Sequence, residues 1–580
     1  MKKAKFSAIP MAQNILQLCL TKNIKKVIIS PGSRNAPLTI SFANHPEIEA
    51  YSVVDERSAA FMAMGMAQKL DAPVAICCTS GSALLNYFPA VAEAFYSDIP
   101  LVVISADRPV ERINIGDGQT IMQKNVYGDH VLYSANLYSE IVLDKVPKEA
   151  KLQQKYREAQ QHNEREINLA LNAAIEKQGP VHINVPFYEP LYETTTEFST
   201  HPVSIEPILN AKTTTQQALK PYVEIWNSAK RKLVLVGVNK PDAIEQQFLE
   251  KMAKDPSVLV FSETTSNLHH PDFISRIDRF IAPLEIAENP KKAFQQLQPD
   301  ILLTFGGMVI SKKLKAFLRH YQPQHHWHVD PKKALNTYFC LNKHFDIQPN
   351  EFFSKFFPQT DQTESGYRDK WLKIKNKNDA GHKDYIQEIP FSDFYAFSEI
   401  FRSLPDQQLL HISNSSAIRY AQLFPLKPGN EVFCNRGTSG IDGSTSTAVG
   451  AAKFSKKDTT LITGELAFFY DSNAFWNGVL PETFRAIVIN NGGGGIFRIL
   501  PGAKNEDYFK HYFETRHDRK AERIANEFDF HYFKATDKDS LQKGLKNLYS
   551  KKQGILEIFT PTELNDEILL KYFEFLKELK

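Results

Sequence analysis

Short runs of apolar residues alternate with longer, mixed stretches along the first part of the chain. Each run is followed by a turn or by a group of residues that starts a helix, and the runs lie at 26–30, 52–55, 73–78 and 101–105. We interpret them as strands, with a helix over 57–70 after the second. Short apolar strands that alternate with helices imply a parallel sheet covered on both faces. Ligands of such a sheet bind at the carboxyl ends of its strands.

The same alternation returns twice further along the chain. Residues 148–178 are highly charged and predict a long, solvated helix, and 188–200 has the Glu-, Thr- and Pro-rich composition of a linker. A second α/β unit begins near 232, the polar segment 350–390 is interpreted as another linker, and a third unit starts at 408. We therefore predict an α/β protein of three doubly wound domains with mainly parallel sheets, bounded at 1–190, 191–355 and 356–580.

Composition narrows the class of protein. The formal net charge of the 580 residues is only +3, from 69 basic and 66 acidic side chains, which argues against a nucleic-acid-binding protein. The five cysteines have no zinc-like spacing. Gln13, Asn14 and Gln17 interrupt the apolar stretch that a signal peptide would need, and no apolar run approaches the roughly 18 residues that span a bilayer. We expect a cytoplasmic protein with reduced cysteines.

An acidic residue and a glycine-rich loop follow two strands of the third unit. Glu465 comes after the apolar run 459–463, and Asn491 with the glycines 492–495 comes after the run 485–490. A carboxylate, an amide oxygen and a backbone carbonyl at neighbouring strand ends form a set of hard oxygen ligands suited to Mg²⁺ or Mn²⁺. Because glycines let the backbone approach a phosphate closely, the pattern predicts a site for a metal-bound diphosphate.

Four arginines lie in or just after loops that follow predicted strands: Arg34, Arg108, Arg419 and Arg436. Any one of them alone is more often a surface ion-pair partner. Together, at the edge where a parallel sheet gathers its ligands, they favour a substrate with several carboxylates, which guanidinium groups bind bidentately.

Three α/β units with a metal-diphosphate site in the last resemble the thiamine-diphosphate enzymes of the decarboxylase and acetolactate-synthase type. Six segments are more specific: 30–38, 55–57, 79–81, 105–109, 414–419 and 435–443. They resemble the MenD family, the 2-succinyl-5-enolpyruvyl-6-hydroxy-3-cyclohexene-1-carboxylate synthases of menaquinone biosynthesis. The resemblance covers essentially the whole chain. It implies a transferase that decarboxylates 2-oxoglutarate and adds the succinyl unit to isochorismate. It also implies thiamine diphosphate, Mg²⁺ or Mn²⁺, and a homodimer or homotetramer with active sites at the subunit interface.

The resemblance further implies a role for each matching position. Residues expected to act in catalysis are Glu56, Gln119, Arg34 and Arg108. Residues expected to contact the substrates are Ser33, Arg34, Arg108, Gln119, Lys312, Ser415, Arg419 and Arg436. Residues expected to contact the cofactor are Glu56, Ser80, Gly81, Ser415, Ile441, Gly464, Glu465, Leu466, Asn491, Gly493, Ile496 and Phe497. The metal would be held by the Glu465 and Asn491 side chains and by the Gly493 carbonyl.

Two of these residues have simpler interpretations as well. Glu56, in a first helical turn, could merely complement the helix dipole rather than hydrogen-bond the cofactor's pyrimidine ring. Ile441 could plug a small loop core instead of bending the cofactor beneath it.

Glu465 departs from the family pattern, which has aspartate at this position. Its longer arm could bind the metal bidentately, so the preferred metal stays open. A different thiamine-diphosphate 2-oxoacid decarboxylase or acetolactate-synthase-like enzyme is the nearest alternative function. A second alternative is a degenerate homologue that binds ligands without catalysing a reaction. Glu465 is the only residue that suggests it.

Overall fold

The computed structural model describes residues 4–140, 149–208, 215–499, 504 and 506–579. The chain forms two compact units. The first comprises Met1–Leu209, Asn435–Thr459 and Ala467–Phe484, and the second comprises Asn210–Cys434, Thr460–Leu466 and Arg485–Lys580. None of the helices in the described part of the chain has the length and apolar character to cross a bilayer.

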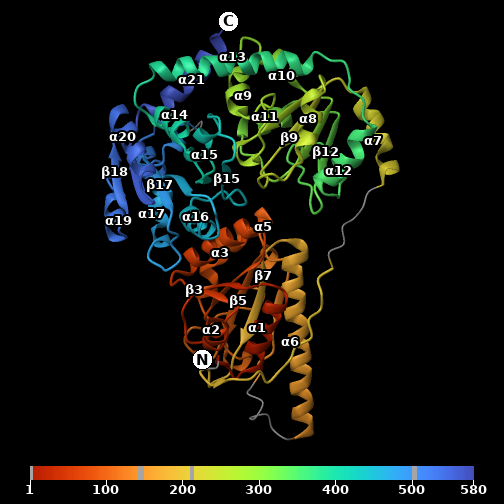
Figure 1. The fold of residues 1–580 in the computed structure, drawn as a ribbon, viewed down its shortest axis with the longest axis vertical. Helices are drawn as coiled ribbons and strands as arrows, with labels where there is room; N and C mark the ends of the chain where they lie inside the picture. The colour runs from red at the N-terminus through yellow and green to blue at the C-terminus, as the bar shows by residue number, and fades with distance from the viewer. Residues whose placement is uncertain (1–3, 141–148, 209–214, 500–503, 505, 580) are drawn as a thin grey trace. The chain divides into compact units, whose positions relative to one another are not determined.

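The first unit contains a six-stranded parallel sheet in the order β3-β2-β4-β5-β7-β6 (Figure 1). Its strands are β2 (Lys26–Ile29), β3 (Glu49–Ser52), β4 (Val74–Cys78), β5 (Leu101–Asp107), β6 (Ser134–Asn136) and β7 (Val181–Pro186). A small antiparallel pair joins β1 (Phe6–Ser7) to β8 (Thr194–Thr195). The helices of this region are α1 (Pro10–Thr21), α2 (Ala36–Asn44), α3 (Glu56–Leu70), α4 (Ala83–Asn86), α5 (Phe88–Ser97) and α6 (Ala150–Lys177). Since β4 and β5 are buried along their whole length, the apolar runs that predicted them are explained by cover on both faces.

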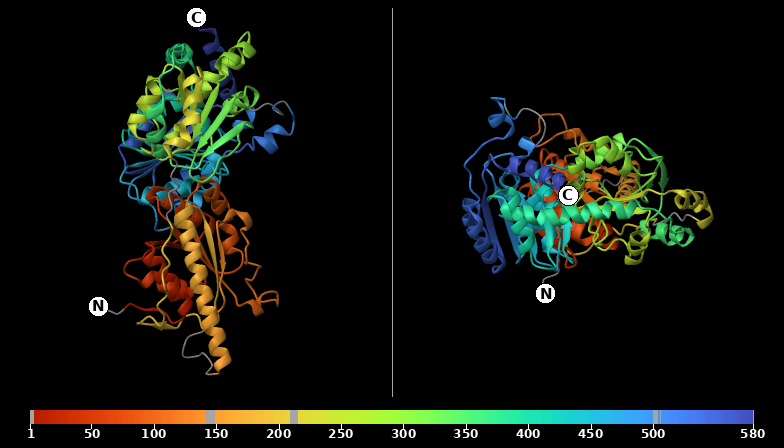
Figure 2. Two further views of the ribbon diagram at one scale, coloured as in Figure 1. Left: turned by 90° about the vertical axis from the view of Figure 1, so that its right-hand side faces the viewer. Right: turned by 90° about the horizontal axis from the view of Figure 1, so that it is seen from above.

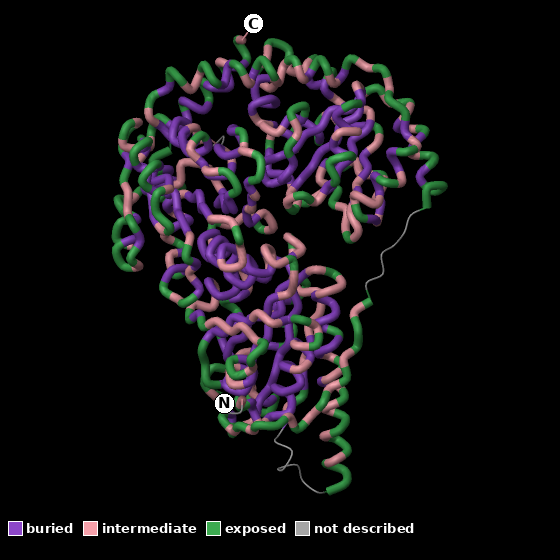
Figure 3. Tube along the Cα trace, in the orientation of Figure 1, coloured by how far each residue is buried: buried purple, intermediate pink, exposed green. Residues whose placement is uncertain are grey.

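The charged segment predicted as a long helix is α6, although residue 148 lies outside the described residues. Figure 2 shows α6 as one unbroken helix beside the sheet, and Figure 3 shows that much of its surface is exposed. Its buried positions, such as Ile167 and Leu171, belong to its second half, where it packs on the sheet core.

Two helices of the first unit cross with almost no space between their backbones. Helix α16 (Ser444–Lys453) packs on α3, and a methyl group on Gly65 would overlap the Thr447 carbonyl oxygen. A methyl group on Gly450 would likewise overlap the Met62 carbonyl oxygen. Glycine is therefore required on both helices at this crossing.

The buried carboxyl group of Glu140 makes the stability of the first unit depend on pH. Glu140 accepts a hydrogen bond from Asn163 Nδ2 (2.7 Å), and burial raises its pKa to about 7. Because this pKa lies above its ordinary value of 4.5, the contribution of Glu140 to stability should be fully present below pH 4.5 and be lost as pH rises through about 7. We expect Glu140→Gln to stabilise the protein at pH 8 by up to about 3 kcal/mol and to change little at pH 4.5. Chemical denaturation at both pH values checks this, and parallel pH profiles for the two proteins would contradict it.

The second unit contains a five-stranded parallel sheet and most of a second six-stranded sheet. The five-stranded sheet has the order β10-β9-β11-β12-β13, from β9 (Lys232–Val236), β10 (Val258–Ser262), β11 (Ile301–Phe305), β12 (His325–Val329) and β13 (Leu341–Phe345). The six-stranded sheet has the order β15-β14-β16-β17-β19-β18, from β14 (Leu409–Ile412), β15 (Glu431–Phe433), β16 (Thr459–Gly464), β17 (Phe484–Asn490), β18 (His531–Ala535) and β19 (Gln553–Phe559). The expected fold class, α/β with mainly parallel sheets, is confirmed.

The remaining helices flank these two sheets. Around the five-stranded sheet they are α7 (Gln216–Ser228), α8 (Gln246–Lys254), α9 (Ile277–Glu285), α10 (Pro290–Leu297), α11 (Lys312–His320) and α12 (Pro349–Phe356). Further along the chain are α13 (Tyr367–Glu388), α14 (Asp393–Ser403), α15 (Ser416–Ala421), α17 (Glu465–Tyr470), α18 (Ile496–Ile499), α19 (Glu522–Glu527), α20 (Lys538–Tyr549) and α21 (Asn565–Glu578).

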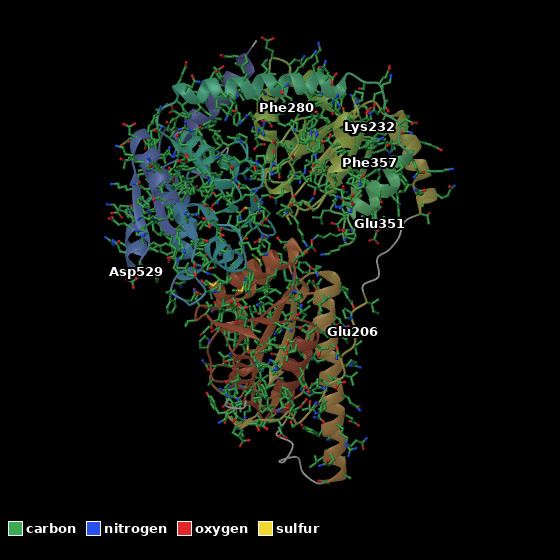
Figure 4. The ribbon with its side chains drawn as sticks, in the orientation of Figure 1. Glu206, Lys232, Phe280, Glu351, Phe357 and Asp529 are labelled. Atoms are coloured by element: carbon green, nitrogen blue, oxygen red, sulfur yellow. The ribbon has the colours of Figure 1, made fainter. Side chains whose placement is uncertain are left out.

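The segment interpreted as a polar linker, 350–390, is largely helical. Helix α13 packs on α9 and α21, and its buried Trp371 meets the ring of Phe280 at 5.7 Å between centroids. Phe280 is labelled beneath α13 in Figure 4. The segment therefore contributes to the core as well as connecting two sheets. The division into three domains with the bounds given above stays a prediction.

Candidate active site

The carboxyl ends of the strands in the first sheet bring two of the predicted arginines together. Arg34 follows β2 and is only 6% exposed; its guanidinium donates to Phe187 O (3.1 Å) and pairs with Glu189 (3.0 Å). Its backbone N–H donates to Thr79 Oγ1 (3.3 Å), which ties it to the loop after β4. Burial lowers the pKa of Arg34, and the nearby charge of Arg108 lowers it further. This edge of the sheet thus carries two neighbouring positive charges, with exposed Ser33 beside them.

Arg108 holds the loop that contains Gln119. Its Nε and Nη2 donate to Gly118 O at 3.1 and 2.8 Å. Gln119 has a φ of +55°, and a methyl group on Gly81 would come within 3.2 Å of the Gln119 Cα. Gly81, with a φ of +90°, is suited to this close approach because it has no side chain. The predicted residues Arg108, Gln119 and Gly81 therefore share one site.

Gln123 links these loops and was missed from sequence. Its Oε1 accepts from Gly81 N (2.9 Å), while its Nε2 donates to Ala106 O (3.1 Å) and Asn184 Oδ1 (2.9 Å). A polar residue within an irregular loop belongs to no recognisable motif, so only the structure identifies Gln123 as buried and fully engaged.

Glu56 is the first residue of α3 and is half-buried. The helix begins at Asp55, whose side chain accepts from Ser58 N (3.2 Å). Burial raises the pKa of the Cys78 thiol well above its usual range, and the charges of Cys77 and then Glu56 add to the effect. Glu56 therefore lies near Cys78, the last residue of β4.

The 435–443 loop, which contains Arg436 and Ile441, is fastened to α5 within the first unit. Buried Glu93 accepts from Gly437 N (2.6 Å), Thr438 N (2.6 Å) and Thr438 Oγ1 (2.8 Å). Ile441 is nevertheless 37% exposed, a large apolar side chain without full cover. An exposed isoleucine on an anchored loop is suited to contact a bound ligand.

Replacing Glu93 with glutamine should loosen this loop. The two carboxylate oxygens of Glu93 each accept from one backbone N–H, whereas a glutamine has a single acceptor oxygen. Either the Gly437 or the Thr438 N–H would then face the NH₂ group of the glutamine, which cannot accept a hydrogen bond. We expect about 1–3 kcal/mol lower stability and, if Arg436 contacts a substrate as the resemblance implies, a raised KM for that substrate. Thermal unfolding and initial-rate kinetics check this, and Ser97→Ala, which removes only the Ser97 contact to Glu93 Oε1 (2.8 Å), is the control. Glu93→Gln with unchanged stability and KM would contradict it.

The predicted metal ligands meet in the second unit. Glu465 is 3% exposed; its Oε1 accepts from Gly493 N (2.8 Å) and lies 3.4 Å from His517 Nε2. Burial raises the pKa of Glu465, and the His517 contact partly offsets this. Gly493 has a φ of +158°, and a side chain there would overlap Glu514 O. His517 was not anticipated from sequence.

Asn491 carries a buried oxygen that suits a cation. Its Nδ2 donates to Asp393 Oδ2 (3.0 Å), whereas its Oδ1 has no hydrogen-bond partner among the described residues. Burial raises the pKa of Asp393 to about 6, with a contribution from the charge of Glu465, so Glu465 and Asn491 lie around the same carboxyl group. A buried acceptor without a donor is costly unless a ligand satisfies it. These residues therefore fit a divalent metal, although the described part of the chain has no cluster of three or more His, Cys, Asp or Glu side chains.

The other predicted site residues are distributed between the units. Ser415 is the N-cap of α15 with an unusual φ of +68°, and Arg419 lies near Asp278, whose pKa is raised by burial and lowered in part by Arg419. Lys312 begins α11 and is exposed. The second unit also contains the residues that flank the metal ligands, namely Gly464, Leu466, Ile496 and Phe497. The first unit contains Ser33, Arg34, Glu56, Ser80, Gly81, Arg108, Gln119, Arg436 and Ile441.

Comparisons with known proteins show the family to which the chain belongs. Residues 10–131 match the thiamine pyrophosphate enzyme N-terminal TPP binding domain, and residues 206–412 match the middle domain of thiamine pyrophosphate enzymes. A 2-succinyl-5-enolpyruvyl-6-hydroxy-3-cyclohexene-1-carboxylate synthase of Christiangramia forsetii is 59% identical over 99% of this chain and 100% of its own. Proteins of the same name from Flavobacterium johnsoniae and Porphyromonas gingivalis are 51% and 36% identical, over 98% and 97% of this chain and 99% and 96% of their own. The chain therefore belongs to the 2-succinyl-5-enolpyruvyl-6-hydroxy-3-cyclohexene-1-carboxylate synthase family of thiamine-diphosphate enzymes.

Proposed function

We propose that this protein decarboxylates 2-oxoglutarate and adds the succinyl unit to isochorismate. The product is 2-succinyl-5-enolpyruvyl-6-hydroxy-3-cyclohexene-1-carboxylate, from which pyruvate has not yet been eliminated. The observation that carries the proposal is the pair of neighbouring guanidinium groups, Arg34 and Arg108, beside Gln119 and Gly81 at one sheet edge. Two substrates with four carboxylates in all need such cations, whereas a simple 2-oxoacid decarboxylase does not.

Thiamine diphosphate, when bound, supplies the electron sink for decarboxylation and carbon–carbon bond formation. Glu56 would donate a hydrogen bond to the pyrimidine nitrogen and so set the position of a proton. Ser80 and Gly81 would contact the same ring, and Ile441 would hold the two rings close together. Ser33, Arg34, Arg108 and Gln119 would orient isochorismate, while Lys312, Ser415, Arg419 and Arg436 would bind the acid groups of 2-oxoglutarate.

A divalent metal would join the diphosphate to the second unit. Glu465 and Asn491 side chains and the Gly493 carbonyl would be its protein ligands, with Gly464, Leu466, Ile496 and Phe497 around the diphosphate. Because Glu465 reaches further than aspartate, we propose that Mn²⁺ serves as well as Mg²⁺. We further propose a cytoplasmic homodimer or homotetramer whose active sites lie between subunits.

The test mixes the protein with thiamine diphosphate, Mg²⁺, 2-oxoglutarate and isochorismate and follows isochorismate loss by absorbance. We expect loss only when both substrates are present. CO₂ release from pyruvate alone would favour the alternative, a simpler 2-oxoacid decarboxylase or acetolactate-synthase-like enzyme. Tight calorimetric binding of the cofactor without turnover would indicate a ligand-binding homologue that has lost activity.

A further inference from the structure

Two adjacent asparagines at the end of β17 are bonded in different ways. Asn490 is fully engaged: its Oδ1 accepts from Gly492 N (3.1 Å), and its Nδ2 donates to Arg519 O (3.0 Å) and Glu557 Oε1 (2.7 Å). Asn491 is engaged only through Nδ2, which donates to Asp393, while its buried Oδ1 has no hydrogen-bond partner within the described ranges. Of the two amides, only that of Asn491 offers an acceptor to a ligand.

Asp393 is held in place on both sides. Its Oδ1 accepts from Thr560 Oγ1 (2.5 Å), and its backbone N–H donates to Asn565 Oδ1 (2.8 Å). It is the first residue of α14, and the helix is capped by Ser392, whose side chain accepts from Tyr395 N (3.3 Å). With Oδ1 held by Thr560, the Oδ2 of Asp393 accepts from Asn491 Nδ2 (3.0 Å) and so pairs with the NH₂ end of this amide rather than with its oxygen.

We infer that Asp393 is a positioning residue that turns the Asn491 oxygen toward the metal. The two ends of an amide have nearly the same shape, so their hydrogen-bond partners decide which end faces the site. With the amide reversed, an NH₂ group would point at a cation that requires oxygen ligands. This inference rests on the proposed function, because it concerns the metal of the same site.

The first experiment measures Mn²⁺ affinity by electron paramagnetic resonance titration in the presence of thiamine diphosphate. Asp393→Leu removes the acceptor and keeps a similar side-chain volume. We expect Mn²⁺ to bind about ten- to a hundredfold more weakly, the usual cost of losing a group that orients a ligand. Glu557→Gln is the matched control, because it changes a buried carboxylate that holds the neighbouring Asn490, and it should leave the affinity unchanged.

A double variant that exchanges the two side chains distinguishes an effect on the orientation of residue 491 from an effect on folding. In the double variant Asp393→Asn with Asn491→Asp, residue 393 donates, residue 491 accepts with one oxygen, and its second oxygen faces the metal. We expect this variant to regain most of the Mn²⁺ affinity that Asp393→Leu loses. Should Asp393→Leu fail to fold, Asp393→Asn carries the test, because its oxygen keeps the Thr560 contact and its NH₂ faces the Asn491 amide. Weaker Mn²⁺ binding would then support the inference, and a folded variant with wild-type binding would overturn it.

The outcomes separate this inference from the proposed function. A wild-type protein that binds no Mn²⁺ would overturn the metal site itself. Wild-type binding that Asp393→Leu leaves intact would overturn only the role of Asp393. Equal losses in Asp393→Leu and Glu557→Gln would also overturn it, because a general disturbance of the sheet edge would then explain both.

Discussion

Glu56→Gln is expected to lower kcat by about a hundredfold to ten-thousandfold, the usual contribution of a positioned acid–base group. Glutamine keeps the size of the side chain and its place at the start of α3, but it cannot share an acidic proton with the cofactor's ring nitrogen. The KM values for both substrates should change little, because Glu56 is not among the residues proposed to contact them.

Steady-state kinetics with saturating thiamine diphosphate and Mg²⁺ measure this effect. Glu522→Gln is the matched control, since Glu522 is also the acidic first residue of a helix, α19, and is exposed. If Glu56 only complements the helix dipole, both variants should cost a few tenths of a kcal/mol to about 1 kcal/mol of stability and leave kcat near normal. Near-normal turnover by Glu56→Gln would exclude the catalytic role.

Glu465→Gln should weaken Mn²⁺ binding by more than about a hundredfold. Removing a residue that only orients a metal ligand already lowers metal affinity by about ten- to a hundredfold, and Glu465 is proposed to be a ligand itself. It removes the one carboxylate among the three proposed ligands, while the glutamine oxygen can still accept from Gly493 N. The metal-free protein should unfold at a higher temperature at pH 8, because burial raises the pKa of Glu465 and makes its ionised form costly there.

Titration of Mn²⁺ and thermal unfolding of the metal-free protein together test this prediction. Glu465→Asp, which keeps the carboxylate and shortens the side chain by one methylene group, should retain binding and serves as the control. An unchanged Mn²⁺ affinity in Glu465→Gln would remove Glu465 from the ligand set. A loss of affinity accompanied by a lower unfolding temperature would instead indicate damage to the fold.

The sequence predicted those parts of the site that depend on local pattern. Glu465 and Asn491 follow two apolar runs that prove to be the neighbouring strands β16 and β17, so their approach follows from the topology of the sheet. Arg108 was predicted in the same way from the end of β5, whereas Gly81, after the neighbouring strand β4, was implied by the family resemblance.

The contacts that hold these residues could not be predicted, because they join positions far apart in the chain. Glu93 binds the backbone of Gly437, and Asp393 binds Asn491, without any spacing that would indicate either pair. Trp371 shows a different limitation. Most residues around it in α13 are polar, so the sequence did not reveal that one side of this helix packs into the core.

The crossing of α3 and α16 at Gly65 and Gly450 limits the substitutions that this enzyme can tolerate. Glu56 opens the first of these helices, and the loop that carries Ile441 leads into the second. A single added carbon at either glycine would push the two helices apart and shift both Glu56 and the loop that carries Ile441. Saturation mutagenesis should therefore find both positions intolerant of every substitution, and laboratory evolution of new substrate ranges should leave them untouched.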